Sequence, residues 1–218
     1  MSETILAFDS SMSNCSVALL HKNNVYSKNK ICNKNQTKYI LPMIKQALEI
    51  NSLNLNEISV IIISKGPGDF IGIRTTIAVA QGLTLGLDIP IIAFSTISIM
   101  VEQAWKTFKK NKILILLKKN NTQVCFIQYV KNKEHLGIDK KYVQTLAIEE
   151  TAKKLLTLND SWIIVGNCLS LFSKNIYKNL IFTNISFPQS KFIISLYLSY
   201  KNCQKHNLFH NISPIYSL

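Results

Sequence analysis

Glycine is scarce in this chain and strongly clustered. Of seven glycines in 218 residues, five fall within one 21-residue stretch, at Gly66, Gly68, Gly72, Gly82 and Gly86. Such a cluster marks backbone that needs unusual dihedral angles or close approach, so this stretch constrains the fold most. The apolar run Val60–Ser64 precedes it, and an apolar segment surrounds its last two glycines. We expect a buried strand, a tight loop and then a helix over about 73–87.

The flanking segments predict an α/β protein. Three short runs, Thr4–Phe8, Ser16–Leu20 and Asn24–Lys28, are typical of an antiparallel meander, and helical spacing follows at 39–50. Further strands are expected at 90–94, 112–117, 123–130 and 162–165, and helices at 97–108, 148–158 and 191–204. A strand-rich and then helical pattern that occurs twice predicts two related lobes with mixed sheets, residues 1–108 and 109–218.

The chain carries a net charge of +13, which favours a nucleic-acid or acidic-membrane binder. However, 24 of its 25 basic residues are lysine, and phosphate and groove recognition usually relies on arginine. Residues 1–108 hold nine basic and seven acidic side chains, whereas residues 109–218 hold sixteen and five. Lys, Ile and Asn share A/T-rich codons, so mutational bias can supply much of this charge. A direct tRNA-binding module remains an alternative that uses the basic second half.

Targeting and redox signals are weak. No run of about 20 apolar residues predicts a membrane span, and Ile5–Phe8 is too short for a signal peptide. We therefore expect a soluble, cytoplasmic protein without a membrane partner. Five cysteines without a C-x-x-C pair favour buried, reduced thiols over a disulfide framework or a zinc ribbon.

The loop after Val60–Ser64 is the most informative motif. Its residues of interest are Gly66, Pro67, Gly68, Asp69, Phe70 and Gly72. Forward-pointing amides near a helix N-terminus would suit an anion, but spacing alone favours a tight strand-to-helix turn. The stretch matches neither the P-loop nor the dinucleotide-binding fingerprint.

This motif resembles a known family. Gly66–Arg74, with Ile5–Ser10, Ala78–Gly86 and Pro90–Thr96, is similar to the TsaB (YeaZ) family, and Pro214-Ile215-Tyr216 is similar to its closing P-V-Y. The resemblance implies a two-lobed actin/Hsp70-like (ASKHA, RNase H-like) fold. It also implies a non-catalytic subunit needed for threonylcarbamoyl modification of the adenosine beside the tRNA anticodon. Such a subunit binds a TsaD-like paralogue, which carries the nucleotide, metal and transferase chemistry.

The resemblance implies further partners, and this chain departs from the family pattern in one segment. A TsaE-like ATPase in a larger complex, tRNA held through the complex, and a homodimer of the free chain are implied, with no cofactor on this subunit. The family usually opens its second lobe with Asp-Ala-Arg-Arg/Met-Gly-Glu-Val-Tyr, where this chain has Lys118–Cys125. Roles of that arginine and those acids are therefore not carried over.

Arg74 and the helix after it are the predicted partner-binding residues. Because every other basic residue is lysine, the surviving arginine indicates a site that needs a planar, bidentate donor, inside the fold or across an interface. Ala78, Gly82 and Gly86 form a small-residue stripe at i, i+4 and i+8. Either a partner or this protein's own first helix can pack there. The resemblance favours the partner and adds Ile44 of the first helix.

Other candidates carry less chemistry. Asp9 follows the first strand, where ASKHA ATPases and RNase H-like nucleases hold metal or phosphate, but the further carboxylates of a two-metal site are missing. A turn residue is favoured there. Val165-Gly166-Asn167 has a single glycine, which disfavours an independent ASKHA-type ATP-binding enzyme, although this stays an alternative. His206 and His210, with Cys203, could hold zinc on a helix, but a surface pair is favoured.

Overall fold

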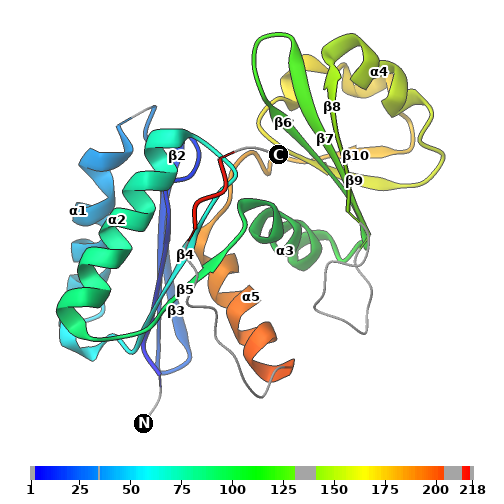
Figure 1. Cartoon of the computed structure of the whole chain (residues 1–218). Coiled ribbons are helices and arrows are strands. Elements are labelled where there is room, and N and C mark those ends of the chain that lie inside the picture. Colours follow the sequence, from blue (N-terminus) through cyan, green and yellow to red (C-terminus); the bar gives the residue numbers. More distant parts are fainter. Residues whose placement is uncertain (1–2, 34, 131–140, 204–212, 217–218) are drawn as a thin grey trace. The chain divides into compact units, whose positions relative to one another are not determined.

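The computed structural model describes residues 3–33, 35–130, 141–203 and 213–216. It divides into two compact units (Figure 1). Residues Met1–Ile99 and Pro188–Ser217 form the first unit, and residues Met100–Phe187 form the second.

The first unit is a five-stranded mixed sheet with helices on both faces. Its elements are β1 (Ile5–Asp9), β2 (Asn14–His21), β3 (Asn24–Ile31), α1 (Gln36–Ile50), β4 (Val60–Ser64), α2 (Phe70–Leu87), β5 (Ile91–Phe94) and α5 (Ser190–Cys203). The strand order is β3-β2-β1-β4-β5, and α3 (Thr96–Phe108) starts in this unit. β1–β2 and β2–β3 pair antiparallel, whereas β1–β4 and β4–β5 pair parallel. The meander therefore supplies one half of the sheet and the strand–helix crossovers supply the other.

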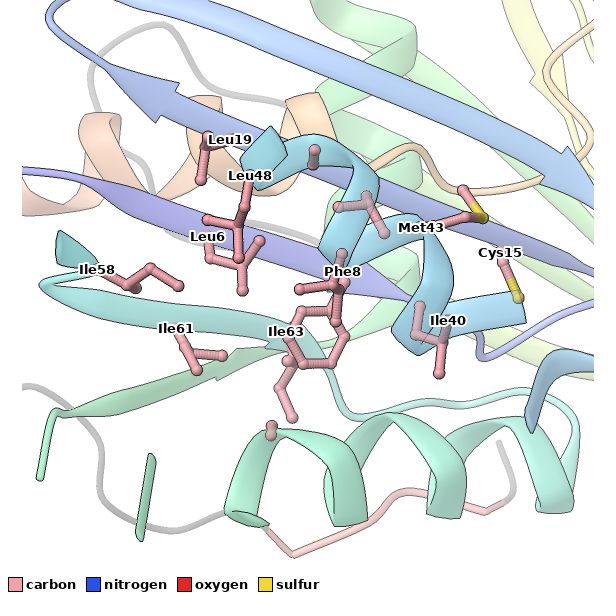
Figure 2. Packing of buried hydrophobic residues seen from close by; sticks show 14 of the residues in the cluster. Leu6, Phe8, Cys15, Leu19, Ile40, Met43, Leu48, Ile58, Ile61 and Ile63 are labelled. Atoms are coloured by element: carbon pink, nitrogen blue, oxygen red, sulfur yellow. The ribbon is translucent and has the colours of Figure 1, made fainter. Parts of the chain in front are cut away.

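Alternation along β1 sends its side chains into two cores. Leu6 and Phe8 pack in the cluster formed with α1 and α2, which Figure 2 shows from close by. Ile5 and Ala7 point to the opposite face and pack with residues of α5, among them Tyr197. Because both faces of the sheet are covered, β1 and β4 are buried along their whole lengths.

The second unit repeats the strand order of the first. It contains β6 (Lys112–Lys118), β7 (Gln123–Val130), β8 (Lys141–Ala147), α4 (Ile148–Leu156), β9 (Trp162–Val165) and β10 (Leu180–Phe182), with short 3-10 helices at Leu169–Leu171 and Lys174–Ile176; another, Leu55–Glu57, lies in the first unit. Its sheet runs β8-β7-β6-β9-β10, with antiparallel β6–β7 and β7–β8 pairs and parallel β6–β9 and β9–β10 pairs. The predicted pair of related α/β lobes is thus confirmed.

The C-terminal part of the chain differs from the predicted division into residues 1–108 and 109–218. Ser190 donates from its hydroxyl to the Ser16 carbonyl at 2.8 Å, and its amide donates to Ser16 Oγ at 2.7 Å. Ile193 and Tyr197 of α5 then pack in the core against β1. Residues 188–203 and 213–216 therefore belong to the first unit, because α5 covers the face of its sheet that α1 and α2 leave open.

Candidate functional site

The glycine-rich loop packs directly on the turn that follows β1. A Cβ added at Gly68 would lie 1.9 Å from the Ser11 carbonyl oxygen, and one at Gly72 would lie 1.9 Å from that of Ser10. The Asp69 amide donates to the Ser11 oxygen at 2.6 Å. Backbone atoms of Ser10 and Ser11 occupy the space that side chains at these two positions would need, so only glycine permits this close approach. This geometry agrees with the tight-turn interpretation.

Hydrogen bonds of side-chain hydroxyl groups connect the turn after β1 to the start of α2. Ser10 Oγ donates to the Gly72 carbonyl at 3.0 Å and lies 2.8 Å from Thr76 Oγ1, which also accepts from the Ser10 amide at 3.0 Å. Ser11 Oγ lies 3.0 Å from Thr96 Oγ1 at the start of α3. All four side chains are buried. The orientation of the first turn of α2 is therefore fixed by groups that water does not reach.

Asp9 is a fully buried carboxyl at the end of β1. Its Oδ1 accepts from the Ser11 amide at 3.1 Å and from the Ser64 hydroxyl, whereas Oδ2 has no hydrogen-bond partner among the described residues. Burial raises the pKa of Asp9 to about 6 against the hydrogen bonds, which lower it. Across the described ranges, no group of three His, Cys, Asp or Glu side chains could hold a metal. His206 and His210 lie outside the described residues.

Arg74 stacks on aromatic rings at the surface of the first unit. Its Cζ lies 3.9 Å from the centroid of the Phe70 ring, and its Nε donates to the Tyr216 hydroxyl at 3.2 Å. The two rings lie 5.1 Å apart. Tyr216 is held because the Ile215 amide donates to the Lys65 carbonyl at 2.8 Å. In the part of the chain that the structure describes, no carboxylate forms a salt bridge with Arg74.

The small-residue stripe of α2 faces away from the sheet. Ala78, Gly82 and Gly86 are exposed, and a Cβ added at either glycine would meet nothing within 4 Å. The alternative in which the first helix packs on this stripe is therefore wrong. We call the exposed residues of this side the outer α2 face; they are Ile71, Arg74, Ala78, Gln81, Gly82, Leu85 and Gly86.

Bulky apolar side chains at both ends of the outer α2 face were not singled out by the sequence analysis. Ile71 is 59% exposed and Leu85 is 87% exposed. Helical spacing from Gly82 could have found them, because residues three and four apart share a face. Ile44, predicted to contact a partner, is only 3% exposed and lies in the core beneath α1. It supports α1 from inside and is not part of an outer surface.

The segment that departs from the family pattern forms the β6–β7 hairpin. Asn120 Oδ1 accepts from the Gln123 amide at 2.8 Å and from the Thr122 amide at 2.9 Å, and so closes the turn. The Lys118 amide donates to Asn167 Oδ1 at 2.8 Å. The Asn120 side chain is therefore used by the turn of the hairpin itself.

Comparison with known proteins identifies the family. A family model described as TsaD, tRNA N6-adenosine threonylcarbamoyltransferase, matches residues 21–180. The tRNA threonylcarbamoyladenosine biosynthesis protein TsaB of Buchnera aphidicola subsp. Baizongia pistaciae is 48% identical over 217 residues, covering 99% of this chain and 98% of that protein. The chain belongs to the TsaB family. The TsaB protein of Haemophilus influenzae is 30% identical, over 98% of this chain and 92% of that relative.

The solved structures show the fold of this TsaB family member. YeaZ from Pseudomonas aeruginosa superimposes with a TM-score of 0.80 at 22% identity, covering 99% of this chain and 100% of that structure. A second structure from that organism, titled as similar to peptidase YeaZ, gives a TM-score of 0.79, with 99% of each chain covered. Together with the repeated sheet, this confirms the two-lobed ASKHA-like, RNase H-like fold.

α2 is long and apolar, and the structure accounts for its apolar residues on one side of the helix. Among the described helices it alone has the length and composition to cross a membrane. Its inner side, however, contributes Ile73, Ile77 and Ala80 to the core of the first unit. A helix that fills a protein core with one side has only its other side left for contacts, so α2 leaves the outer α2 face as an exposed, largely apolar surface.

Proposed function

We propose that this TsaB family member is an accessory subunit of tRNA threonylcarbamoyladenosine synthesis, and that it acts by binding a TsaD-like paralogue through the outer α2 face. The observation that carries the proposal is the open, apolar side of α2. A Cβ added at Gly82 or Gly86 would meet no described residue within 4 Å, yet glycine inside a helix costs about 0.5–1 kcal/mol relative to alanine. A partner that approaches closely supplies the missing reason for both glycines.

The shape of the outer α2 face suits a helix of the partner. Small residues in its middle, Ala78, Gly82 and Gly86, let a second helix approach near the low end of the usual 8–10 Å axis separation. Ile71 and Leu85 then flank the contact and bury apolar surface against the partner. The match of the chain to a TsaD family model supports a paralogue as that partner, because related subunits commonly pair through equivalent elements.

The chemistry is assigned to the partner and not to this chain. Asp9 is fully buried without further carboxylates beside it in the described residues, and the glycine-rich loop is filled by backbone, which disfavours a phosphate or metal at either place. In this proposal ATP and metal are bound by the TsaD-like subunit, and the complex holds tRNA. A TsaE-like ATPase joins the larger assembly, and the free chain forms a homodimer.

Co-purification with the TsaD-like protein of the same cell tests this function. Gly82→Arg places a long side chain in the middle of the outer α2 face and should abolish co-purification, with an unchanged circular dichroism spectrum. Leu156→Arg is the matched control, because it puts the same charge on an exposed apolar position of α4 in the second unit. Retained association of Gly82→Arg would overturn the proposed interface.

The same preparations separate this function from its alternatives. An independent ATP-binding enzyme requires that the isolated chain bind ATP, which calorimetry measures directly. A direct tRNA-binding module requires strong retention of the isolated chain on tRNA, with a steep loss of affinity as salt rises. The accessory-subunit proposal expects neither result from the chain alone.

A further inference from the structure

The outer α2 face carries one charge. Between Phe70 and Leu87, Arg74 is the only charged residue, and no carboxylate of the described residues forms a salt bridge with it. Covering this face with an apolar partner would remove the guanidinium from water. An unpaired buried charge is strongly destabilising, so a partner that covers Arg74 needs a compensating anion at that point.

The guanidinium is held in one orientation before any partner binds. Its Cζ lies over the Phe70 ring, 3.9 Å from the ring centroid, and the Tyr216 hydroxyl accepts from Nε at 3.2 Å. With Nε engaged, the two terminal nitrogens remain as a parallel pair of donors. A carboxylate accepts from such a pair through both of its oxygens, and this end-on geometry is strong and specific.

Tyr216 reaches this place from a distant part of the chain. The segment 213–216 is fixed by the hydrogen bond from the Ile215 amide to the Lys65 carbonyl, at 2.8 Å. A Cβ on Gly66 would lie 2.1 Å from the Ile215 oxygen, so the absence of a side chain there permits the contact. The glycine-rich loop thus has a task beyond turning the chain, because it seats the segment that carries Tyr216.

We propose that Arg74, clamped by Phe70 and Tyr216, binds a carboxylate side chain of the TsaD-like partner, and that Tyr216 is a positioning residue for this contact. The inference rests on the proposed function and adds the chemistry of its anchor point. Within the outer α2 face a second copy of this chain offers no acidic residue, and its Asp69 and Asp88 lie just beyond the two ends of the helix. We therefore assign the anion to the TsaD-like partner, and the oligomeric state of the Arg74 variants tests the second copy as its source.

Calorimetric titration of the chain with its TsaD-like partner tests the contact. Arg74→Lys keeps the charge but loses the paired donors and should raise Kd about tenfold or more. Tyr216→Phe keeps the ring against Phe70 and removes only the hydroxyl, so we expect a rise of about threefold to tenfold. In the double variant the two effects should be clearly less than multiplicative, because Tyr216 acts through Arg74. Tyr142→Phe, at an exposed tyrosine of β8, is the matched control and should leave Kd unchanged.

The outcomes separate this inference from the proposed function. If Arg74→Lys and Tyr216→Phe bind as tightly as the unmodified chain while Gly82→Arg does not bind, the carboxylate contact is wrong and the interface stands. If Gly82→Arg binds normally, the interface itself is wrong. Multiplicative effects of Arg74→Lys and Tyr216→Phe would overturn the positioning role of Tyr216. If Arg74 instead served only a homodimer, its variants would change the oligomeric state of the free chain and leave Kd for the partner unaltered.

Discussion

Replacing Gly82 and Gly86 by alanine should stabilise the free chain and weaken its complex. Each glycine lies inside α2, where alanine is favoured by about 0.5–1 kcal/mol. A Cβ at either position meets nothing within 4 Å, so no steric cost offsets this gain. The two positions lie on successive turns with no shared contact in the free chain. Their effects should therefore add to an increase of about 1–2 kcal/mol in the free energy of unfolding.

The complex should respond in the opposite direction. Added methyl groups on the outer α2 face push a closely packed partner helix outward and disturb its fit. We expect Kd for the TsaD-like protein to rise about tenfold or more, on the scale of a core overpacking cost of roughly 1–3 kcal/mol. Urea unfolding followed by circular dichroism measures the first effect, and calorimetric titration measures the second. Hydrogen exchange at the α2 amides reports the stability of this helix even if the two units unfold separately.

Two results would refute this reasoning. A fall in the stability of the double alanine variant would mean that the glycines are required within the fold, contrary to the open space around them. Raised stability with an unchanged Kd would mean that the outer α2 face does not closely contact this partner.

Three further predictions concern the fold around the site. Gly72→Ala should lower the free energy of unfolding by several kcal/mol, because the added Cβ would lie 1.9 Å from the Ser10 carbonyl oxygen. Urea unfolding measures this loss, and an unchanged free energy of unfolding would show that the backbone moves to accommodate the methyl group. Burial raises the pKa of Asp9 from 3.8 to about 6, so ionisation of Asp9 opposes folding. Stability is largest with Asp9 protonated and falls by about 3 kcal/mol as pH rises from about 3 to 7. Asp9→Asn should flatten this part of the pH profile of stability, and an unaltered profile would contradict the buried ionisation. Ser190→Ala removes the hydroxyl that donates to the Ser16 carbonyl and should lower the free energy of unfolding by about 1–2 kcal/mol. An unchanged midpoint of thermal or urea unfolding would show that water replaces this hydroxyl as the donor.

Buried strands were the most predictable part of the fold. β4, β7 and β9 have the bounds expected from the sequence. β4 and β9 are short apolar runs that are buried along their whole lengths, which is typical of strands covered on both faces. α2 begins at Phe70 instead of about residue 73, because Asp69 is its N-cap and the first turn includes Gly72, which periodicity does not mark as helical. β8 and β10 were not predicted. β8 lies at a sheet edge with exposed apolar side chains, and β10 has only three residues.

Long-range contacts set the limit of prediction for the site. Composition singled out Arg74, and spacing singled out Gly82, since both are properties of the local sequence. Tyr216, by contrast, is 142 positions from Arg74, and no local pattern connects them. Ile44 was placed on the wrong side of α1, although it shares the helical spacing of Ile40 and Leu48, which face the sheet. Such errors arise because periodicity defines a helix face without stating what covers it.

Two glycines of α2 and the single arginine independently indicate that a partner binds this helix. Gly66, Gly68 and Gly72 are required by the fold, because carbonyl oxygens occupy the space of their missing side chains, whereas Gly82 and Gly86 are not. Likewise, the composition replaced arginine by lysine at every other basic position, and the one arginine left is stacked on Phe70. A lysine cannot place paired planar donors above that ring. The two glycines cost the free chain stability, and Arg74 forms no salt bridge with a carboxylate of the described residues. Because both features lie on one side of the same helix, the simplest common cause is a partner that binds there.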